Sequence, residues 1–191
     1  MPLIACEFSG SRPAALKADR GTLELVLCPE CSHIYNRAFE PERMRYTAGY
    51  ENALGFSAHY REYLRETVDH LIRTYGLHRR SIVDIGCGSA DFLSLICAQG
   101  ANHGVGYDPS QQSHTTQAGD GTVSVVAETF SAAKQEAVDF VCSQHVLEHL
   151  WDLGGTLRDA RSILKHDGAG YFEVPNGMAT FVGHAVWDLT Y

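Results

Sequence analysis

Two histidines and a glutamate lie within five residues of one another in the segment HVLEH at 145–149. On a long helix, this H-x-x-E-H spacing would place two imidazoles one turn apart beside a carboxylate, and such a set can hold a metal ion for hydrolysis. However, the segment directly follows VDFVCSQ, an apolar and β-branched run that is typical of a strand. We therefore expect His145, Glu148 and His149 to lie at a strand end and in the following turn, which leaves a metal hydrolase as the weaker alternative.

A second segment with chemical potential is VDIGCGSADFL at 83–93. A strand ending near Asp84 passes into Gly86 and Gly88, where missing side chains let the backbone approach a ligand before a helix begins. Asp91 occupies the third glycine position of a dinucleotide-binding fingerprint, and two carboxylates would repel a pyrophosphate. The site therefore favours a ligand with a cationic part, such as S-adenosylmethionine with its sulfonium and ammonium groups.

Short apolar runs alternate with helical or turn segments along most of the chain. The strand-like runs are SIVDIGC (81–87), HGVGYD (103–108), TVSVVAE (122–128), AVDFVCS (137–143) and AGYFEVP (169–175). This alternation predicts an α/β fold with a parallel sheet covered on both faces. Upstream, the apolar residues between Ser57 and Tyr75 recur on one helical face, which predicts an amphipathic helix with Ser57 as N-cap and Gly76 as its C-terminal stop.

The segments VDIGCGSADFL and, about twenty residues later, GVGYDPS resemble the first two motifs of class I S-adenosylmethionine-dependent methyltransferases. The segments DFVCSQHVLEHLWD and ILKHDGAGYFEVPN resemble later blocks of the same family, so that the resemblance runs from about residue 80 to 176. It implies a Rossmann-like, doubly wound and mostly parallel sheet with helices on both faces. Ala90 stands where many members have a third glycine, a change that we expect the turn to accept.

The resemblance also implies roles for individual residues. Asp84 would anchor the methionine end of the cofactor, the backbone of Gly86, Cys87 and Gly88 would line it, and Asp108 would accept hydrogen bonds from the ribose hydroxyls. Glu128 would follow the strand that contacts adenine, and Ser143 would lie beneath the transferable methyl. Without this context, Asp108 followed by a proline is equally typical of a turn cap.

His145 is the expected base toward the methyl acceptor, because it comes first after its strand. Tyr50, with Tyr46, matches a tyrosine-bearing lid of the sugar-methylating relatives and is a second candidate. Either side chain is needed only where the acceptor must lose a proton. A histidine that simply binds backbone at a strand end, and tyrosines that simply pack a lid, are the alternatives. At the level of the whole chain, the alternative to an enzyme is a non-catalytic module that retains the cofactor fold for binding or assembly.

The early cysteines Cys6, Cys28 and Cys31 indicate a knuckle, because CPEC places two thiols three residues apart on a hairpin-like turn. Structural zinc takes four soft ligands in a tetrahedron, and the fourth ligand is in doubt here. The layout is similar to sugar C-methyltransferases with an N-terminal zinc knuckle, which implies a zinc ion. Because only His33 or Ser9 could serve as that fourth ligand, a metal-free hairpin is slightly favoured over a bound zinc ion.

The sequence predicts three parts: a Cys-rich hairpin at 1–40, a lid and helix at 41–76, and a methyltransferase core at 77–191 in which the last strands of the fold are missing. The net charge of -8, without a basic cluster, argues against a nucleic acid and favours a small-molecule methyl acceptor. No apolar run approaches the roughly 20 residues of a membrane span, and no secretion signal is recognisable. We therefore expect a cytoplasmic protein. Its oligomeric state is not indicated.

Overall fold

The structure is a computed structural model that describes residues 9–43, 55, 57–177 and 182. The chain divides into two compact units, one of residues 53–175 and one of residues 1–52 with 176–191. The larger unit holds the sheet and the helices that cover it, and the smaller unit holds a hairpin. Each unit is described by itself.

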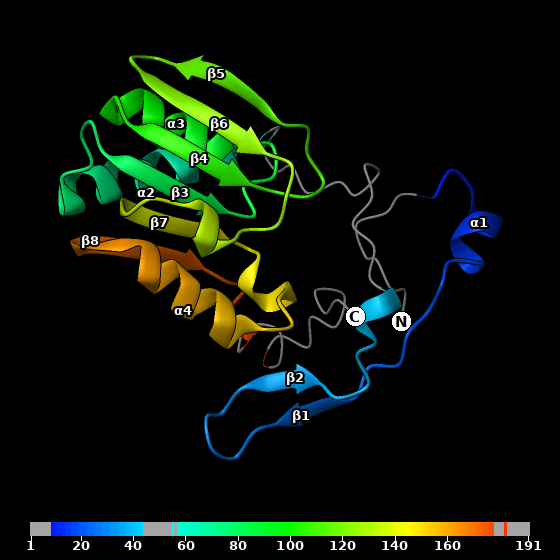
Figure 1. Ribbon diagram of the computed structural model, residues 1–191. Helices are drawn as coiled ribbons and strands as arrows, with labels where there is room; N and C mark the ends of the chain where they lie inside the picture. The colour runs from blue at the N-terminus through cyan, green and yellow to red at the C-terminus, as the bar shows by residue number, and fades with distance from the viewer. Residues whose placement is uncertain (1–8, 44–54, 56, 178–181, 183–191) are drawn as a thin grey trace. The chain divides into compact units, whose positions relative to one another are not determined.

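The larger unit is built on a six-stranded sheet with strand order β5-β6-β4-β3-β7-β8 (Figure 1). Its strands are β3 (Ser81–Ile85), β4 (His103–Tyr107), β5 (His114–Ala118), β6 (Gly121–Val126), β7 (Val138–Gln144) and β8 (Leu164–Glu173). All neighbours pair in parallel except β5, which is antiparallel to β6. From β3 in the middle of the sheet, the chain first forms β4, β5 and β6 on one side of β3. It then crosses to the other side of β3, where it forms β7 and β8. This reversal leaves the carboxyl ends of β3, β4 and β7 at the place where doubly wound sheets bind ligands.

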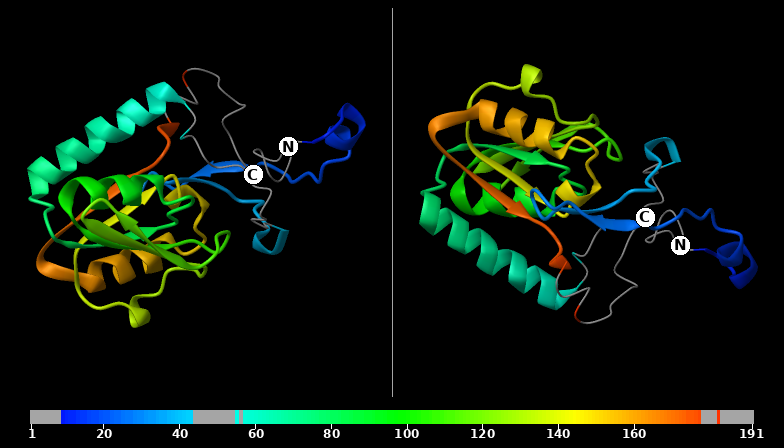
Figure 2. Two further views of the ribbon diagram at one scale, coloured as in Figure 1. Left: turned by 90° about the horizontal axis from the view of Figure 1, so that it is seen from above. Right: turned by 90° about the horizontal axis from the view of Figure 1, so that it is seen from below.

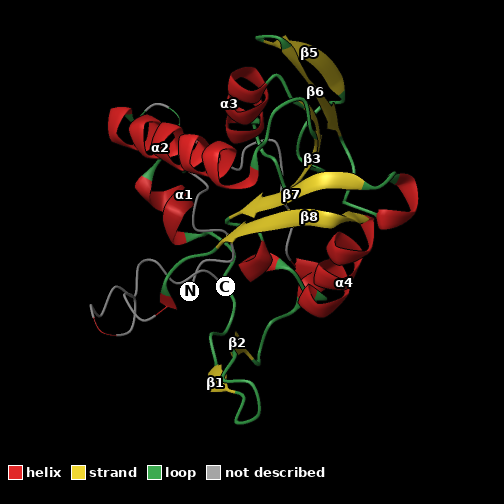
Figure 3. Ribbon diagram, turned by 90° about the vertical axis from the view of Figure 1, so that its left-hand side faces the viewer, coloured by secondary structure: helices red, strands yellow, loops and turns green. Residues whose placement is uncertain are grey.

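Helices cover both faces of this sheet, as expected. On one face, α2 (Ala58–Tyr75) and α3 (Asp91–Gly100) pack on apolar side chains of the strands, and on the other α4 (Leu153–Ile163) does so (Figures 2 and 3). Two separate clusters of buried side chains result, because successive residues of a strand point to opposite faces. The first cluster includes Leu64, Val68, Leu93, Ile96, Ile82 and Phe140, and the second includes Val83, Val141, Ala160 and Ile163.

The amphipathic helix expected between Ser57 and Tyr75 is confirmed as α2. The Ser57 hydroxyl accepts a hydrogen bond from the backbone N–H of Tyr60 at 3.3 Å, which caps the first turn. Gly76 ends the helix in the left-handed region with φ of 60°, a conformation that glycine adopts without steric cost.

The edge strand β5 was not expected from the sequence, in which no strand was predicted between the runs at 103–108 and 122–128. Its residues HTTQA are polar, and all but Ala118 are exposed, so that no apolar alternation marks them as a strand. They are extended because their backbone groups pair with β6, from His114 opposite Val125 to Ala118 opposite Gly121.

In the smaller unit, β1 (Leu25–Leu27) and β2 (Ile34–Asn36) form the expected antiparallel hairpin. A short helix, α1 (Arg12–Leu16), precedes the hairpin, and a 3-10 turn, η1 (Pro41–Arg43), follows it. The Asn36 amide supports the strand ends, because its Oδ1 accepts from the N–H of Glu24 at 2.8 Å.

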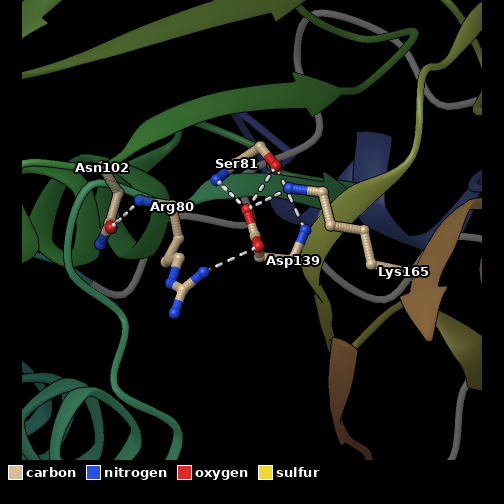
Figure 4. A network of polar contacts seen from close by, with 5 residues as sticks. All are labelled: Arg80, Ser81, Asn102, Asp139 and Lys165. Atoms are coloured by element: carbon tan, nitrogen blue, oxygen red, sulfur yellow. Dashed lines mark hydrogen bonds and ion pairs between the residues drawn. The ribbon is translucent and has the colours of Figure 1, made fainter. Parts of the chain in front are cut away.

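At the amino ends of the strands, the Asp139 carboxylate joins β7 to β3 and β8 (Figure 4). Its Oδ2 accepts from the Ser81 backbone N–H and hydroxyl and from Lys165 Nζ at 2.8–2.9 Å, and Arg80 approaches Oδ1 at 3.3 Å. Burial raises the pKa of Asp139, but these hydrogen bonds and the Lys165 charge outweigh it and lower the pKa to about 2. A small cavity of about 80 Å³ adjoins this network and is far smaller than a nucleoside would need.

Candidate functional site

The turn between β3 and α3 is made possible by three residues in the left-handed backbone region. Gly86 and Gly88 have φ of 74° and 51°, and Ala90 has φ of 60°. The backbone N–H groups of Gly86 and Cys87 both donate to the Tyr107 carbonyl, at 2.8 and 3.2 Å, which ties the turn to the end of β4. Ala90 thus adopts the glycine conformation of this turn, as the sequence analysis expected the turn to allow.

Gly86 is required by space as well as by its φ angle. A Cβ atom at this position would lie 2.3 Å from Cγ2 of Val146, which belongs to the segment after β7. That segment therefore lies directly against the glycine turn. Residues that are sixty positions apart in the chain line one edge of the sheet.

Asp84 is the most perturbed carboxyl group at this edge. Asp84 is the second-last residue of β3 and is only 3% exposed. Its pKa is raised to about 7, chiefly by burial; a hydrogen bond with the Cys142 thiol opposes this shift, and the negative charge of Asp108 adds to it. A carboxyl group in this position gains most from a cation, because a cation restores the charged form that burial disfavours.

Asp108 follows β4 and is bound by donors of the protein itself. Its Oδ2 accepts from the backbone N–H of Gly88 at 2.9 Å, and its Oδ1 accepts from the N–H and hydroxyl of Ser110 at 2.9 and 2.5 Å. It therefore closes the glycine turn and caps its own turn. A carboxylate has about four acceptor positions, so one remains for a ligand hydroxyl and a second requires an exchange of partners.

Cys87 lies in the same turn and packs against β4. A Cβ atom at Gly106 would lie 2.5 Å from its sulfur, so the glycine of β4 makes room for the thiol. Burial raises the pKa of Cys87, and the charges of Asp84 and Asp108 raise it further. The thiol is therefore neutral, and Cys87 can line a ligand but is a poor nucleophile.

The side chains of two further predicted cofactor-binding residues bind other groups of the protein. The Ser143 hydroxyl is fully buried and donates to the Ile85 carbonyl at 2.8 Å, which joins the ends of β7 and β3. Glu128 is exposed after β6 and forms an ion pair with Lys134. Their assignment to cofactor binding remains a prediction.

His145 and His149 lie where the sequence analysis expected them, beyond the end of β7. His145 directly follows the strand, and His149 ends the one-turn 3-10 segment η3 (Leu147–His149), so no long helix carries the pair. Glu148 Oε1 lies 4.0 Å from His145 Nδ1 and 3.9 Å from His149 Nε2. Among the residues that the structure describes, no group of three or more His, Cys, Asp or Glu side chains is arranged to hold a metal ion.

The structure adds Glu173 to the site, a residue that was not predicted from the sequence. Glu173 ends β8, and its Oε1 lies 3.1 Å from His145 Nε2. Its Oε2 accepts from Gln144 Nε2 at 2.9 Å and from the Tyr171 hydroxyl at 2.6 Å. The available signal was a single acid in the apolar run AGYFEVP, near the carboxyl end of its strand.

The electrostatics of Glu173 follow from these contacts. Burial raises its pKa, but hydrogen bonds from His145, Tyr171, Gln144 and Tyr63 outweigh burial and lower the pKa to about 2. Burial and the hydrogen bond to Glu173 in turn raise the pKa of Tyr171. At neutral pH, a carboxylate therefore lies beside the His145 ring, and the protonated phenol of Tyr171 donates to the other oxygen of that carboxylate.

Aromatic side chains of α2 and α3 adjoin this group. The rings of Tyr60 and Tyr63 on α2 are 6.1 Å apart, and Phe92 on α3 stacks on Tyr171 at 6.1 Å. Burial raises the pKa of Tyr60, and the charge of Glu173 raises it further. The expected lid tyrosines Tyr46 and Tyr50 lie outside the described residues.

The expected knuckle is described only in part. Cys28 and Cys31 are free cysteines on the hairpin turn, and Cys6 lies outside the described residues. Backbone N–H groups of Cys31 and Glu30 donate toward Cys28 and lower its thiol pKa. Ser32 has φ of 60° and closes the turn by donating to the Cys28 carbonyl at 2.9 Å. The turn favours a thiolate, but the described residues supply only two cysteine ligands.

A family model described as a methyltransferase domain matches residues 56–186, which is more than half of the chain. One similar solved structure is that of the plantazolicin methyltransferase BpumL in complex with SAH and a desmethylPZN analog. Its TM-score is 0.50 at 17% sequence identity, and the match covers 64% of this chain and 49% of the BpumL chain. A putative methyltransferase from an antibiotic biosynthesis pathway of Anabaena variabilis has a TM-score of 0.49 at 20% identity, with coverages of 64% and 53%. The cyclopropane synthase MmaA2 from Mycobacterium tuberculosis has a TM-score of 0.48 at 18% identity, with coverages of 74% and 53%.

This chain therefore spans about half the length of these solved structures. The likeness to BpumL is one of fold. No match was found among curated proteins. Within the described residues, no helix is both long enough and apolar enough to cross a membrane.

Proposed function

Since this chain belongs to the methyltransferase domain family, we propose that it binds S-adenosylmethionine at the glycine turn after β3 and methylates a small molecule. When bound, S-adenosylmethionine supplies a methyl group on a positively charged sulfur. The observation that carries the proposal is the buried Asp84 carboxyl beside this turn, whose pKa is raised to about 7. Such a group is suited to a ligand cation and not to the pyrophosphate of a dinucleotide.

Different residues of the chain bind different parts of the cofactor in this proposal. Asp84 holds the ammonium end of the ligand, the backbone from Gly86 to Gly88 lines it, and Asp108 accepts from the ribose. Glu128 and Ser143 complete the cofactor side. Because methyl transfer from a sulfonium is an in-line displacement, the main contribution of the protein is to align the reacting atoms and exclude water.

On the acceptor side, we assign His145 as the base for an acceptor that must lose a proton. Its side chain is 40% exposed at the carboxyl end of β7, next to the turn that contacts Gly86 through Val146. An imidazole titrates in the range where a base is useful at neutral pH. Tyr50 is a second candidate from the lid. We propose a sugar or another natural-product intermediate as the acceptor, because the layout of the early cysteines and of the lid resembles that of sugar C-methyltransferases.

Calorimetry with S-adenosylmethionine and S-adenosylhomocysteine tests the proposal. The wild-type chain is expected to bind both with saturation, and Asp84→Asn and Asp108→Asn are expected to weaken binding by about tenfold or more, the loss of one charge-assisted hydrogen bond. Asp159→Asn, an exposed carboxylate on α4, serves as control. A non-catalytic module that keeps only the fold would show no saturable binding to either compound.

We further propose that the smaller unit binds zinc through Cys6, Cys28 and Cys31. The N–H groups that donate toward Cys28 and lower its thiol pKa support this assignment, since the thiolate is the form that binds metal. Elemental analysis of the purified chain is expected to show one zinc ion, and Cys28→Ser with Cys31→Ser to remove it. A wild-type chain without zinc, purified in the absence of chelators, would refute the assignment.

A further inference from the structure

We propose that Glu173 is a positioning residue that holds the His145 ring in one orientation and one tautomer, an inference that rests on the proposed role of His145 as base. Glu173 ends β8 and His145 follows β7, and these neighbouring parallel strands bring the two residues together at their carboxyl ends. The contact joins residues that are 28 positions apart in the chain.

Two separate contacts join His145 to Glu173, a backbone hydrogen bond and an ion-pair contact of the ring. The backbone N–H of His145 donates to the Glu173 carbonyl at 2.9 Å, and the ring Nε2 lies 3.1 Å from the Glu173 carboxylate. The backbone hydrogen bond fixes the position of the His145 Cα atom, and the contact of the ring with the carboxylate fixes the orientation of the imidazole. Together they leave the imidazole little rotational freedom.

The backbone of His145 supports the same conclusion. Its φ of 54° lies in the left-handed region, which is sterically unfavourable for a non-glycine residue. Such a conformation persists only where the surroundings impose it, and it is concentrated at functional sites. Here the extended backbone of β7 turns sharply at His145, and this turn directs the ring toward the end of β8.

Glu173 is itself held in place. Gln144 and Tyr171 donate to its Oε2, so that Oε1 is the oxygen presented to His145. Because a carboxylate only accepts hydrogen bonds, Nε2 of His145 must carry the hydrogen, and in the neutral ring Nδ1 then carries the lone pair. The titratable groups around the ring are Glu173 and Tyr171 of β8, Glu148 and His149 of the following turn, and Tyr63 of α2.

This arrangement assigns a proton path. Nδ1 takes the proton of the acceptor, and the electron pair left on the acceptor atom forms the bond to the methyl carbon. The electron pair of the broken carbon–sulfur bond stays on sulfur. The imidazolium that results is stabilised by the Glu173 carboxylate, which remains ionised.

Nitrogen-15 NMR of the imidazole rings tests the inference on the full chain without any acceptor. The His145 signals, assigned with His145→Asn, are expected to show the Nε2–H tautomer almost alone in the wild type. Glu173→Gln is expected to lower that fraction toward the mixture found in a free imidazole. Glu173→Asp, which keeps the charge but withdraws it by one methylene, is expected to lie between the two and covers the case in which Glu173→Gln does not fold.

Asp139→Asn is the matched control, since Asp139 is also a carboxylate with several donors and a pKa near 2, at the opposite end of the sheet. It is expected to leave the His145 tautomer unchanged. An unchanged tautomer in both Glu173 variants, or an equal change in Asp139→Asn, overturns the inference. Titration of S-adenosylmethionine into the same samples separates the two proposals, because failure to bind refutes the proposed function while the tautomer still reports on Glu173.

Discussion

At the scale of single residues, Asp84 departs furthest from the usual behaviour of a carboxyl group. Its folded pKa of about 7 lies above its ordinary value of 3.8, because burial disfavours the charge. The folded chain therefore binds this proton more tightly than the unfolded chain does. It follows that the stabilising contribution of the protonated Asp84 is fully present below pH 3.8 and is lost as the pH rises through about 7.

The same proton predicts the pH dependence of cofactor binding. A ligand cation requires the ionised carboxylate, so S-adenosylmethionine is expected to bind about tenfold more weakly at pH 6 than at pH 8. Asp84→Asn should bind weakly at both pH values and without this slope. Calorimetry across the pH range measures the effect, and an equal slope in the wild type and in Asp84→Asn would assign the proton to another group.

Gly86 provides a second test at this scale. Gly86→Ala combines a strained φ of 74° with a clash against Val146, and is expected to lower the free energy of unfolding by about 3 kcal/mol and to abolish cofactor binding. Gly76→Ala has a similar φ but open space around its Cβ, and is expected to cost only about 1 kcal/mol with binding unchanged. Urea denaturation and calorimetry compare the two. Equal losses of unfolding free energy in the two variants would show that the clash with Val146 does not contribute to the effect of Gly86→Ala.

At the scale of elements, the ends of α2 and α3 show how local sequence sets helix boundaries. Ser57 caps the start of α2 through its hydroxyl, and Gly76 ends it in the left-handed region. The helix α3 ends in the same conformation at Ala101, with φ of 52°, where a methyl group adds strain that glycine would avoid. The two helices thus have matching ends with different residues.

These ends predict two opposite changes in stability. Ser57→Ala is expected to lower the free energy of unfolding by about 1 kcal/mol, because the N–H of Tyr60 loses its acceptor. Ala101→Gly is expected to raise it by up to about 1 kcal/mol, because the left-handed strain disappears. Urea denaturation at neutral pH measures both. A loss of stability in Ala101→Gly would show that backbone entropy outweighs the strain at this position.

At the scale of the larger unit, two ionised carboxylates hold opposite ends of the sheet. Asp139 joins the amino ends of β3, β7 and β8, and Glu173 joins the carboxyl ends of β7 and β8. Both have folded pKa values of about 2, below their ordinary values. Their stabilising effect is therefore complete above about pH 4.5 and is lost as the pH falls through 2.

This linkage predicts an acid-sensitive sheet. Asp139→Asn is expected to lower the free energy of unfolding by about 2 kcal/mol at pH 7, which is the value of its pKa shift. The difference from wild type should shrink as the pH falls toward 2, because Asp139 is protonated in the unfolded state and becomes protonated in the folded state as the pH passes through 2. Urea denaturation from pH 7 to pH 2 measures it, with Asp159→Asn expected to change stability by less than about 0.5 kcal/mol. A difference that is constant with pH would assign the loss to packing instead of charge.

The sequence by itself determined the features that depend on near neighbours. The strand, glycine turn and helix from Ser81 to Gly100 were predictable because backbone freedom at Gly86 and Gly88 and apolar periodicity act over a few residues. The caps of α2 were predictable for the same reason. The mostly parallel sheet followed from the alternation of such segments, since parallel strands require a crossover between them.

Only the tertiary structure decided which distant side chains meet. The contact between Glu173 and His145 depends on the pairing of β7 with β8, and the Asp139 network depends on the pairing of β7 with β3. The strand β5 was equally hidden, because its polar residues are extended only through backbone pairing with β6. The raised pKa of Asp84 likewise comes from its burial and from the charge of Asp108, which follows another strand. Each of these features depends on register and burial, which no short stretch of sequence contains.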